Sequence, residues 1–300
     1  MQAADCQNEL ETLATLLERS GEYRILRRLV PRPPMTPRVG EATRVGLFVD
    51  VETTGLDPSR DEIIELAMVP FTYGIGGEIY EIGKGFSALR DPEIPIPSRV
   101  TAITGITDDM VRGRTIDPAE IMTLVGEADL VVAHNATFDR PFLEAFCNVF
   151  ATLPWACSMS DVDWAAEGYE GTKLCHLAAQ AGFFYDKHRA THDCLAGIEL
   201  LARHQPVSGR SGLQHLLDRA RAPYCRIWAI SSPFDLKDQL KARGYRWNAD
   251  AISGYRAWYI DLPVEAKDAE LAFLVTEIYR QEVDLPVRSL DAYNRFTSRI

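Results

Sequence analysis

Two carboxylates, Asp50 and Glu52, lie two residues apart inside an otherwise apolar run and could do chemistry together. The run spans residues 45–51 and has polar residues on either side, which predicts a strand buried on both faces. Residues two apart on a strand point to the same face, so both carboxylates would project side by side. Two buried like charges are unfavourable without a cation, and hard divalent cations prefer such oxygen ligands. The alternative is a surface strand with an acidic face.

Two later segments add polar groups of the same kind. Asp139 ends the pattern HNATFD, which begins at His134 after a second apolar run, and Asp193 ends the pattern HRATHD, which begins at His188. Together with the DxE pattern at residues 50–52, these motifs resemble the DEDDh subgroup of 3′→5′ exonucleases. That subgroup belongs to the DnaQ-like proofreading family, which includes the epsilon subunit of bacterial DNA polymerase III. The resemblance covers about residues 44 to 205.

The resemblance implies hydrolysis of phosphodiester bonds at the 3′ end of single-stranded nucleic acid, with DNA as the first expectation and nucleoside 5′-monophosphates as products. Two divalent ions about 4 Å apart would support this reaction. Asp50, Glu52 and Asp193 would hold one ion, and Asp50 would bridge to a second ion that Asp139 supports. Oxygen ligands favour Mg²⁺ or Mn²⁺ and argue against zinc.

One histidine of the last motif is the candidate general base. His188 lies five positions before Asp193 on the loop that enters a helix, and an imidazole can accept a proton near neutral pH. His192 is adjacent to Asp193, but its spacing does not match the family's catalytic histidine. A surface or hydrogen-bonding role is therefore expected for His192, and His134 is expected to be structural.

The resemblance also suggests where the substrate would lie. In the family, backbone amides after the first strand meet the terminal nucleotide, and an apolar side chain wedges beside its base. Gly55 would permit a close approach of backbone and ligand, and Phe138 would either stack on a base or pack in the core. The candidate substrate contacts are Thr53, Gly55, Leu56, Asn135 and Phe138.

The elements that must position these residues follow from hydrophobic periodicity and turn signals. Strands are expected at 61–73 and 79–86 as an antiparallel meander with the first strand, and further strands at 129–134 and 154–159. Helices are expected at 117–128, 140–150, 172–182 and 190–204. This order predicts an α/β, RNase H-like fold, in which a mixed five-stranded sheet is flanked by helices.

A proline-rich linker, the extent of the family resemblance and a junction rich in Ser and Gly at 208–212 divide the chain into three parts. Residues 1–43 are expected to form a helical extension, helical over 5–30, with a proline-rich linker; 44–206 to form the exonuclease domain; and 207–300 to form a small C-terminal α+β module. The module combines aromatic residues and arginines in GYRWN at 244–248 and RAWY at 256–259. This composition suits contact with nucleic acid. A hydrophobic core with ordinary surface arginines is the slightly favoured alternative.

Charge limits the class of partner. The 300 residues carry a net charge of −11, and residues 45–206 contain 25 Asp and Glu residues against 11 Lys and Arg residues. A protein that follows a long duplex needs a basic groove, so the expected ligand is a single-stranded or frayed 3′ end or a short oligonucleotide.

Other features narrow the classes of protein. No apolar stretch has the length of a membrane span or of a signal peptide, which predicts a cytoplasmic protein without membrane attachment. The six cysteines lack CxxC pairing, which argues against a zinc ribbon.

Two alternative functions remain open: trimming of RNA, as in RNase T-like and oligoribonuclease-like relatives, and a role as a proofreading-type binding subunit of a polymerase. A polymerase or another protein is therefore a possible partner, and the oligomeric state is left open.

Overall fold

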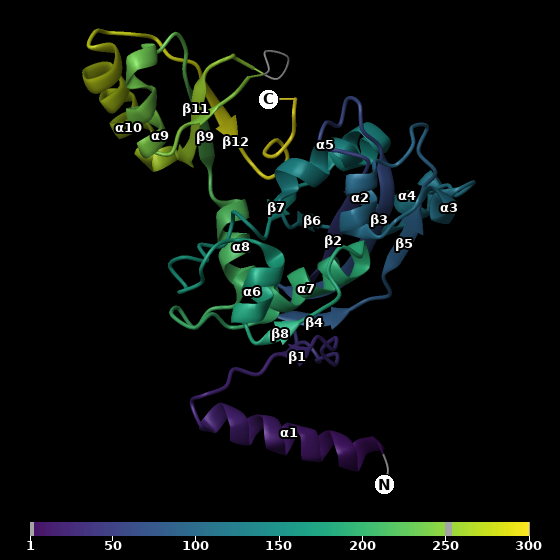
Figure 1. The fold of residues 1–300 in the computed structure, drawn as a ribbon. Coiled ribbons are helices and arrows are strands. Elements are labelled where there is room, and N and C mark those ends of the chain that lie inside the picture. Colours follow the sequence, from purple (N-terminus) through teal and green to yellow (C-terminus); the bar gives the residue numbers. More distant parts are fainter. Residues whose placement is uncertain (1–2, 250–253, 300) are drawn as a thin grey trace.

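The computed structural model describes residues 3–249 and 254–299, and the side chains from residue 8 onward in that first range. The sequence also predicts a hairpin around Asn248–Gly254, and its loop lies partly outside the described residues. The chain builds a large mixed sheet covered by helices, followed by a smaller sheet with its own helices (Figure 1). The fold class predicted from the sequence is confirmed.

The larger sheet has six strands among the described residues, rather than the predicted five. Their order is β4-β3-β2-β6-β7, and β5 also pairs with β3. Strand β2 is antiparallel to β3 and parallel to β6, which in turn is parallel to β7. The bounds are β2 (Thr43–Thr53), β3 (Ile63–Gly74), β4 (Ile79–Ile82), β5 (Phe86–Leu89), β6 (Leu130–Ala133) and β7 (Trp155–Cys157).

The sixth strand arises because the predicted strand at 79–86 is broken in two. Pro70 lies in the middle of β3, and its carbonyl accepts a hydrogen bond from the N–H of Gly83. Because proline has no N–H, the ladder on this edge cannot continue through Pro70. Strand β4 therefore pairs with β3 on one side of Pro70, and β5 pairs on the other.

Helices cover both faces of this sheet. Helices α4 (Pro118–Gly126) and α5 (Ala136–Phe146) pack on the face that carries Leu47, Val49 and Val51 of β2. Helices α6 (Leu174–Gln180), α7 (Ala190–Ala202) and α8 (Gly212–Arg221) pack on the face that carries Phe48. Strand β2 is therefore buried on both sides, as its apolar run predicted. Two short helices, α2 (Ser98–Thr104) and α3 (Asp108–Val111), precede α4.

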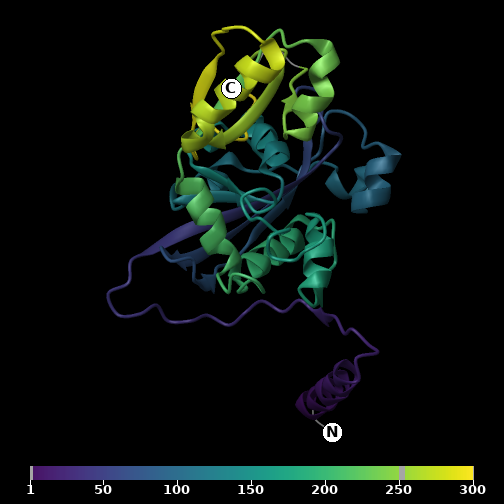
Figure 2. The ribbon, with the colours of Figure 1, turned by 90° about the vertical axis from the view of Figure 1, so that its left-hand side faces the viewer.

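The N-terminal segment is less helical than the sequence suggested. Helix α1 (Ala3–Arg19) ends before Gly21, which has a φ of 77° that favours glycine and ends the helix. The chain then forms β1 (Arg27–Arg28), which pairs with β8 (Phe183–Phe184). Helix α1 lies at one end of the protein in both views (Figures 1 and 2), and its Glu11 and Glu18 pair with Arg27 of β1.

The C-terminal module contains a four-stranded sheet in the order β10-β11-β9-β12. One face of this sheet packs against helices α9 (Lys237–Ala242) and α10 (Lys267–Phe273) through a separate apolar core. The strands are β9 (Tyr224–Ala229), β10 (Arg246–Trp247), β11 (Trp258–Pro263) and β12 (Val287–Leu290). The sequence of the module also predicts one helix over 266–279. In the structure this segment is split into α10 and a π-helical turn over Leu274–Tyr279, and β12 was not predicted.

Candidate active site

Three of the predicted site carboxylates meet beside the central strand. Oxygen atoms of Asp50, Glu52 and Asp193 lie within 4.8 Å of one another. Asp50 and Glu52 share the face of β2 that carries Phe48, and this face lies under α7, whose first turn carries Asp193. Three carboxylates in this arrangement can hold a hard divalent cation, and no nitrogen or sulfur ligand joins them in the described residues.

A close contact between helix and sheet places Asp193. Gly197 lies one turn after Asp193 on α7, and a Cβ atom there would fall 2.1 Å from the Phe48 ring. Only glycine therefore lets α7 approach β2 this closely. The contact brings the first turn of α7 down onto the two carboxylates of β2.

The fourth carboxylate comes from the other covering layer. Asp139 lies in the first turn of α5 and is 2% exposed. Its Oδ1 accepts a hydrogen bond from the N–H of Val51 at 3.2 Å, which fixes it to the strand that carries Asp50 and Glu52. Asp139 lies outside the group of three that converges within 4.8 Å, but it is close enough to Asp50 to raise its pKa.

Burial and mutual repulsion make the four carboxyl groups weak acids. Burial, with repulsion from Asp139 and Asp193, raises the pKa of Asp50 well above its usual range. Burial and the nearby charge of Asp193 raise the pKa of Glu52 to about 7. The pKa values of Asp139 and Asp193 are raised as well, in both cases mainly by burial. A bound cation would relieve this repulsion, so the donor set fits a metal ion.

The three histidines have different surroundings. His188 precedes α7, is half-buried and has a φ of 61°, while its N–H donates to Oδ2 of Asp193 at 2.9 Å. A positive φ is uncommon outside glycine and is enriched at functional sites. His192 is exposed, with Nδ1 3.1 Å from the carbonyl oxygen of Asp186. His134 contacts Ser158 and the Thr172 carbonyl through its two ring nitrogens, and burial lowers its pKa to about 4.

The five predicted substrate contacts differ in how exposed they are and in what they contact. Leu56 is 82% exposed just after β2, whereas Thr53 is buried and donates to the Gly55 carbonyl. The space that the absent side chain of Gly55 leaves is filled by Asp61, because a Cβ atom there would lie 2.4 Å from the carboxylate. Asn135 is half-buried with a φ of 84°, and Phe138 packs against Phe142 with ring centroids 5.0 Å apart. Leu56 is thus the most accessible of these five residues.

Two polar residues beside the cluster were missed by sequence reasoning. Glu65 of β3 is paired in register with Glu52, is 6% exposed, and raises the pKa of both Glu52 and Asp50. The hydroxyl of Tyr185 donates to Oδ1 of Asp193 at 2.9 Å. Glu65 points to the same face of β3 as Ile63 and Ala67, so strand alternation could have predicted that it is buried. Its pairing with Glu52 depends on the register between two strands, which the sequence alone does not specify.

Comparison with known proteins agrees with this geometry. The sequence profile of a family described as exonuclease, of the RNase T type, matches residues 47–201, which include all four carboxylates and His188. The chain belongs to this exonuclease family. This membership agrees with the DnaQ-like exonuclease family that the motifs predicted.

Its curated relatives are much longer proteins. The chain is 37% identical over 201 residues to the PolC-type DNA polymerase III of Thermotoga maritima, a match that covers 65% of this chain and 14% of that protein. It is 34% identical over 159 residues to the PolC-type DNA polymerase III of Clostridium perfringens, which covers 51% of this chain and 10% of that protein. The match is therefore to one segment of a polymerase.

Solved structures support the fold. A zinc-bound complex of E. coli exonuclease I with single-stranded DNA aligns with a TM-score of 0.51 and 15% identity, covering 73% of this chain and 63% of that protein. Another exonuclease I structure aligns with a TM-score of 0.50 and 16% identity, covering 83% of this chain and 63% of that protein.

In the part of the chain that the structure describes, no helix has both the length and the apolar character needed to cross a bilayer.

Proposed function

We propose that this exonuclease removes nucleotides one at a time from the 3′ end of single-stranded or frayed DNA, releasing nucleoside 5′-monophosphates. The observation that carries the proposal is the convergence of Asp50, Glu52 and Asp193 within 4.8 Å, with the buried Asp139 beside them. A protein that only bound nucleic acid would gain nothing from four buried carboxylates, because they repel phosphate.

The carboxylates would hold two divalent ions, Mg²⁺ or Mn²⁺. When bound, such ions supply charge stabilisation for the attacking and leaving oxygens and lower the pKa of water. Asp50, Glu52 and Asp193 would hold one ion, and Asp139 with Asp50 would hold the second. The hydrogen bonds to Asp139 and Asp193 keep these carboxylates oriented without consuming every oxygen lone pair.

His188 is the proposed general base. Its N–H bonds to Asp193 at the entry to α7, and we propose that its imidazole accepts the proton that the attacking water loses. Leu56, exposed after β2, is proposed to contact the terminal base, and Asn135 and the backbone at residues 53–55 to contact the terminal nucleotide. Phe138 contributes mainly to packing in this proposal, because its ring contacts Phe142 in the core.

DNA is proposed over RNA because curated proteins that match this chain over one segment are DNA polymerases. The same likeness supports association with a replicative polymerase as a proposal for the partner. RNA trimming is the alternative that the substrate panel below distinguishes.

The test is a panel of 5′-labelled single-stranded DNA, duplex DNA, RNA and dinucleotides, incubated with Mg²⁺ or Mn²⁺. Stepwise shortening of single-stranded DNA from its 3′ end is expected, and chelation of the metal should stop it. Asp139→Asn and Asp193→Asn should each abolish shortening while circular dichroism remains that of the wild type. If no substrate is shortened with either metal ion, the proposed activity is wrong. If RNA is strongly preferred, the proposed substrate is wrong.

A further inference from the structure

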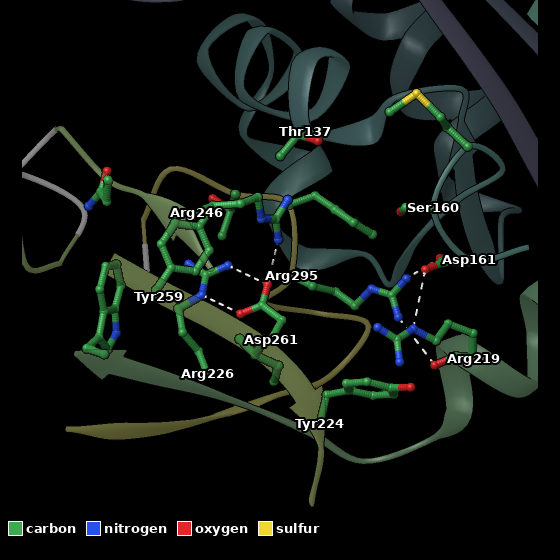
Figure 3. A pocket seen from close by; sticks show the side chains of 16 residues that line it. Thr137, Ser160, Asp161, Arg219, Tyr224, Arg226, Arg246, Tyr259, Asp261 and Arg295 are labelled. Carbon is green, nitrogen blue, oxygen red and sulfur yellow. Dashed lines mark hydrogen bonds and ion pairs between the residues drawn. The ribbon is translucent and has the colours of Figure 1, made fainter. Parts of the chain in front are cut away.

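A cavity of about 260 Å³ lies where the C-terminal module meets the exonuclease fold (Figure 3). Strand alternation explains which side chains of the module line it. Ile227 of β9 and its core neighbours face helices α9 and α10, so Arg226 and Trp228 point to the opposite face. Tyr259 and Asp261 of β11 lie on that face as well, beside Arg246 of β10.

The other wall comes from the exonuclease fold and the end of the chain. Thr137 of α5 and Asp161, which follows β7, line it together with Arg219 in the last turn of α8. The C-terminal segment at 291–299 returns to this wall, where the carbonyls of Tyr293 and Arg295 accept hydrogen bonds from the buried Arg140 of α5. Several segments distant in sequence thus converge on one cavity.

The described lining of this cavity has a charge opposite to that of the protein. Among the residues that the structure describes, four arginines and two aspartates line it, in a chain whose net charge is −11. Arg226 and Arg246 share the Asp261 carboxylate, with N···O distances of 2.7 and 3.3 Å. Arg295 and Arg219 share Asp161 in the same way. Among the described residues that line the cavity, four arginines therefore face two aspartates, and this described part of the lining is positive.

The aromatic side chains of the cavity hold the arginines in place. Arg219 lies over the Tyr224 ring at 3.3 Å from its centroid, and Arg226 lies over the Tyr259 ring at 4.3 Å. Because these ring faces are already covered, the cavity offers guanidinium forks rather than open surfaces for base stacking. Guanidinium forks match the oxygens of phosphate, so the chemistry favours a phosphate group over a nucleobase.

The cavity and the carboxylate cluster flank the same helical turn. Thr137 lines the cavity, and Asp139, two residues later in the first turn of α5, is fixed to β2 at the active site. Residues two apart on a helix point to nearly opposite sides, and a helix is roughly 10 Å across. A strand whose 3′ end lay at the carboxylates would therefore have phosphates within reach of the arginines.

We propose that this cavity binds backbone phosphates of the substrate strand a short distance from its 3′ end. The cavity would supply positive charge beside the acidic exonuclease fold. The C-terminal module would then have a role in holding the substrate. This inference rests on the proposed action on a nucleic acid strand. The competing explanation is that the arginines only fasten the module to the exonuclease fold through Asp161 and Asp261.

Arg246 separates these two explanations. Its side chain is 59% exposed on the edge strand β10, and its ion pair with Asp261 stays within the module. Exposed ion pairs contribute little to stability, so removing Arg246 should not detach the module. Lys241 of α9 is the matched control, because its side chain is 57% exposed and it lies on the helix-covered side of the same sheet.

The experiment measures binding and cleavage with full-length Arg246→Ala, Arg246→Glu, Lys241→Ala and Lys241→Glu. Fluorescence anisotropy with chelator present, on a single-stranded DNA of about 12 nucleotides, should show binding weakened on the order of tenfold by Arg246→Glu and less by Arg246→Ala. The slope of the logarithm of the binding constant against the logarithm of the salt concentration should become shallower by about one. With metal, KM for the same strand should rise while kcat and dinucleotide cleavage stay unchanged, and the lysine variants should match the wild type.

The proposal is overturned if Arg246→Glu binds the strand as the wild type does, or if it loses dinucleotide cleavage equally. It is also overturned if inorganic phosphate or a nucleoside monophosphate binds the wild type as tightly as the strand does, since the cavity would then be a site for a free anion. If no substrate is cleaved but the anisotropy difference persists, the exonuclease proposal fails while the phosphate site stands. Unchanged melting temperatures of the variants keep the comparison independent of folding.

Discussion

Replacing Glu52 with glutamine should stabilise the metal-free protein at alkaline pH and leave it nearly unchanged at acidic pH. Burial and the charge of Asp193 raise the pKa of Glu52 from its ordinary value of 4.5 to about 7 in the folded protein. A carboxyl group with a raised folded pKa contributes its full stability below the unfolded pKa and loses that contribution as pH rises through the folded pKa. Wild-type stability should therefore fall between about pH 5 and pH 8.

The size of the effect follows from the shift in pKa. At about 1.4 kcal/mol per unit, a shift of roughly 2.5 units corresponds to at most about 3 kcal/mol at pH 8 and less than about 1 kcal/mol at pH 5. Because the side chain is only partly buried, solvent screening should reduce the difference at pH 8 to between about 1 and 3 kcal/mol. Glutamine keeps the shape of the neutral carboxyl group, so packing should not change.

The assay is urea unfolding of wild type and Glu52→Gln at pH 5 and pH 8 in the presence of a chelator. Addition of saturating Mg²⁺ or Mn²⁺ should reverse the order at pH 8, because the wild type gains binding free energy that the variant largely loses. Glu81→Gln on the exposed side of β4 is the matched control and should change stability little at either pH. A variant that is no more stable than the wild type at pH 8, or equally more stable at both pH values, would refute the reasoning.

Three further substitutions test other parts of the site. His188→Ala should lower kcat on the order of 10²–10⁴-fold, whereas His192→Ala should retain nearly wild-type rates; equal losses in steady-state assays would show that the base is misassigned. Gly197→Ala should lower the free energy of unfolding by about 1–3 kcal/mol in thermal unfolding, because the added methyl group meets the Phe48 ring on β2. The control Gly126→Ala, in open space on α4, should not destabilise the protein. Equal effects of the two substitutions would contradict the packing argument. Tyr185→Phe should preserve the fold but weaken metal binding measured by calorimetry, because the aspartate that it contacts loses an orienting hydrogen bond; unchanged affinity would show that the bond is dispensable.

Much of the site is written in local sequence. The spacing of Asp50 and Glu52 on an apolar strand fixes their common face, because strand alternation is a property of consecutive residues. The motifs ending at Asp139 and Asp193 predicted that each residue begins or enters a helix, and both lie in first turns. The resemblance of these motifs to a known family predicted the exonuclease family, and the order of the periodic segments predicted the α/β fold; both predictions are confirmed. The catalytic roles of the individual residues stay predictions.

Other features depend on contacts that no local pattern specifies. The break between β4 and β5 follows from the missing N–H of Pro70 on the neighbouring strand, and the pairing of Glu65 with Glu52 follows from the register between strands. The arginine-lined cavity needs α5, the end of α8 and the module sheet to converge, and only the folded chain places Asp161 beside Arg295, 134 residues later. The sequence by itself placed the candidate metal ligands on a strand and on the first turns of two helices, because alternation and helical spacing act within a few residues. The tertiary structure decided which distant charges share a carboxylate, because register and packing join segments that the sequence keeps apart.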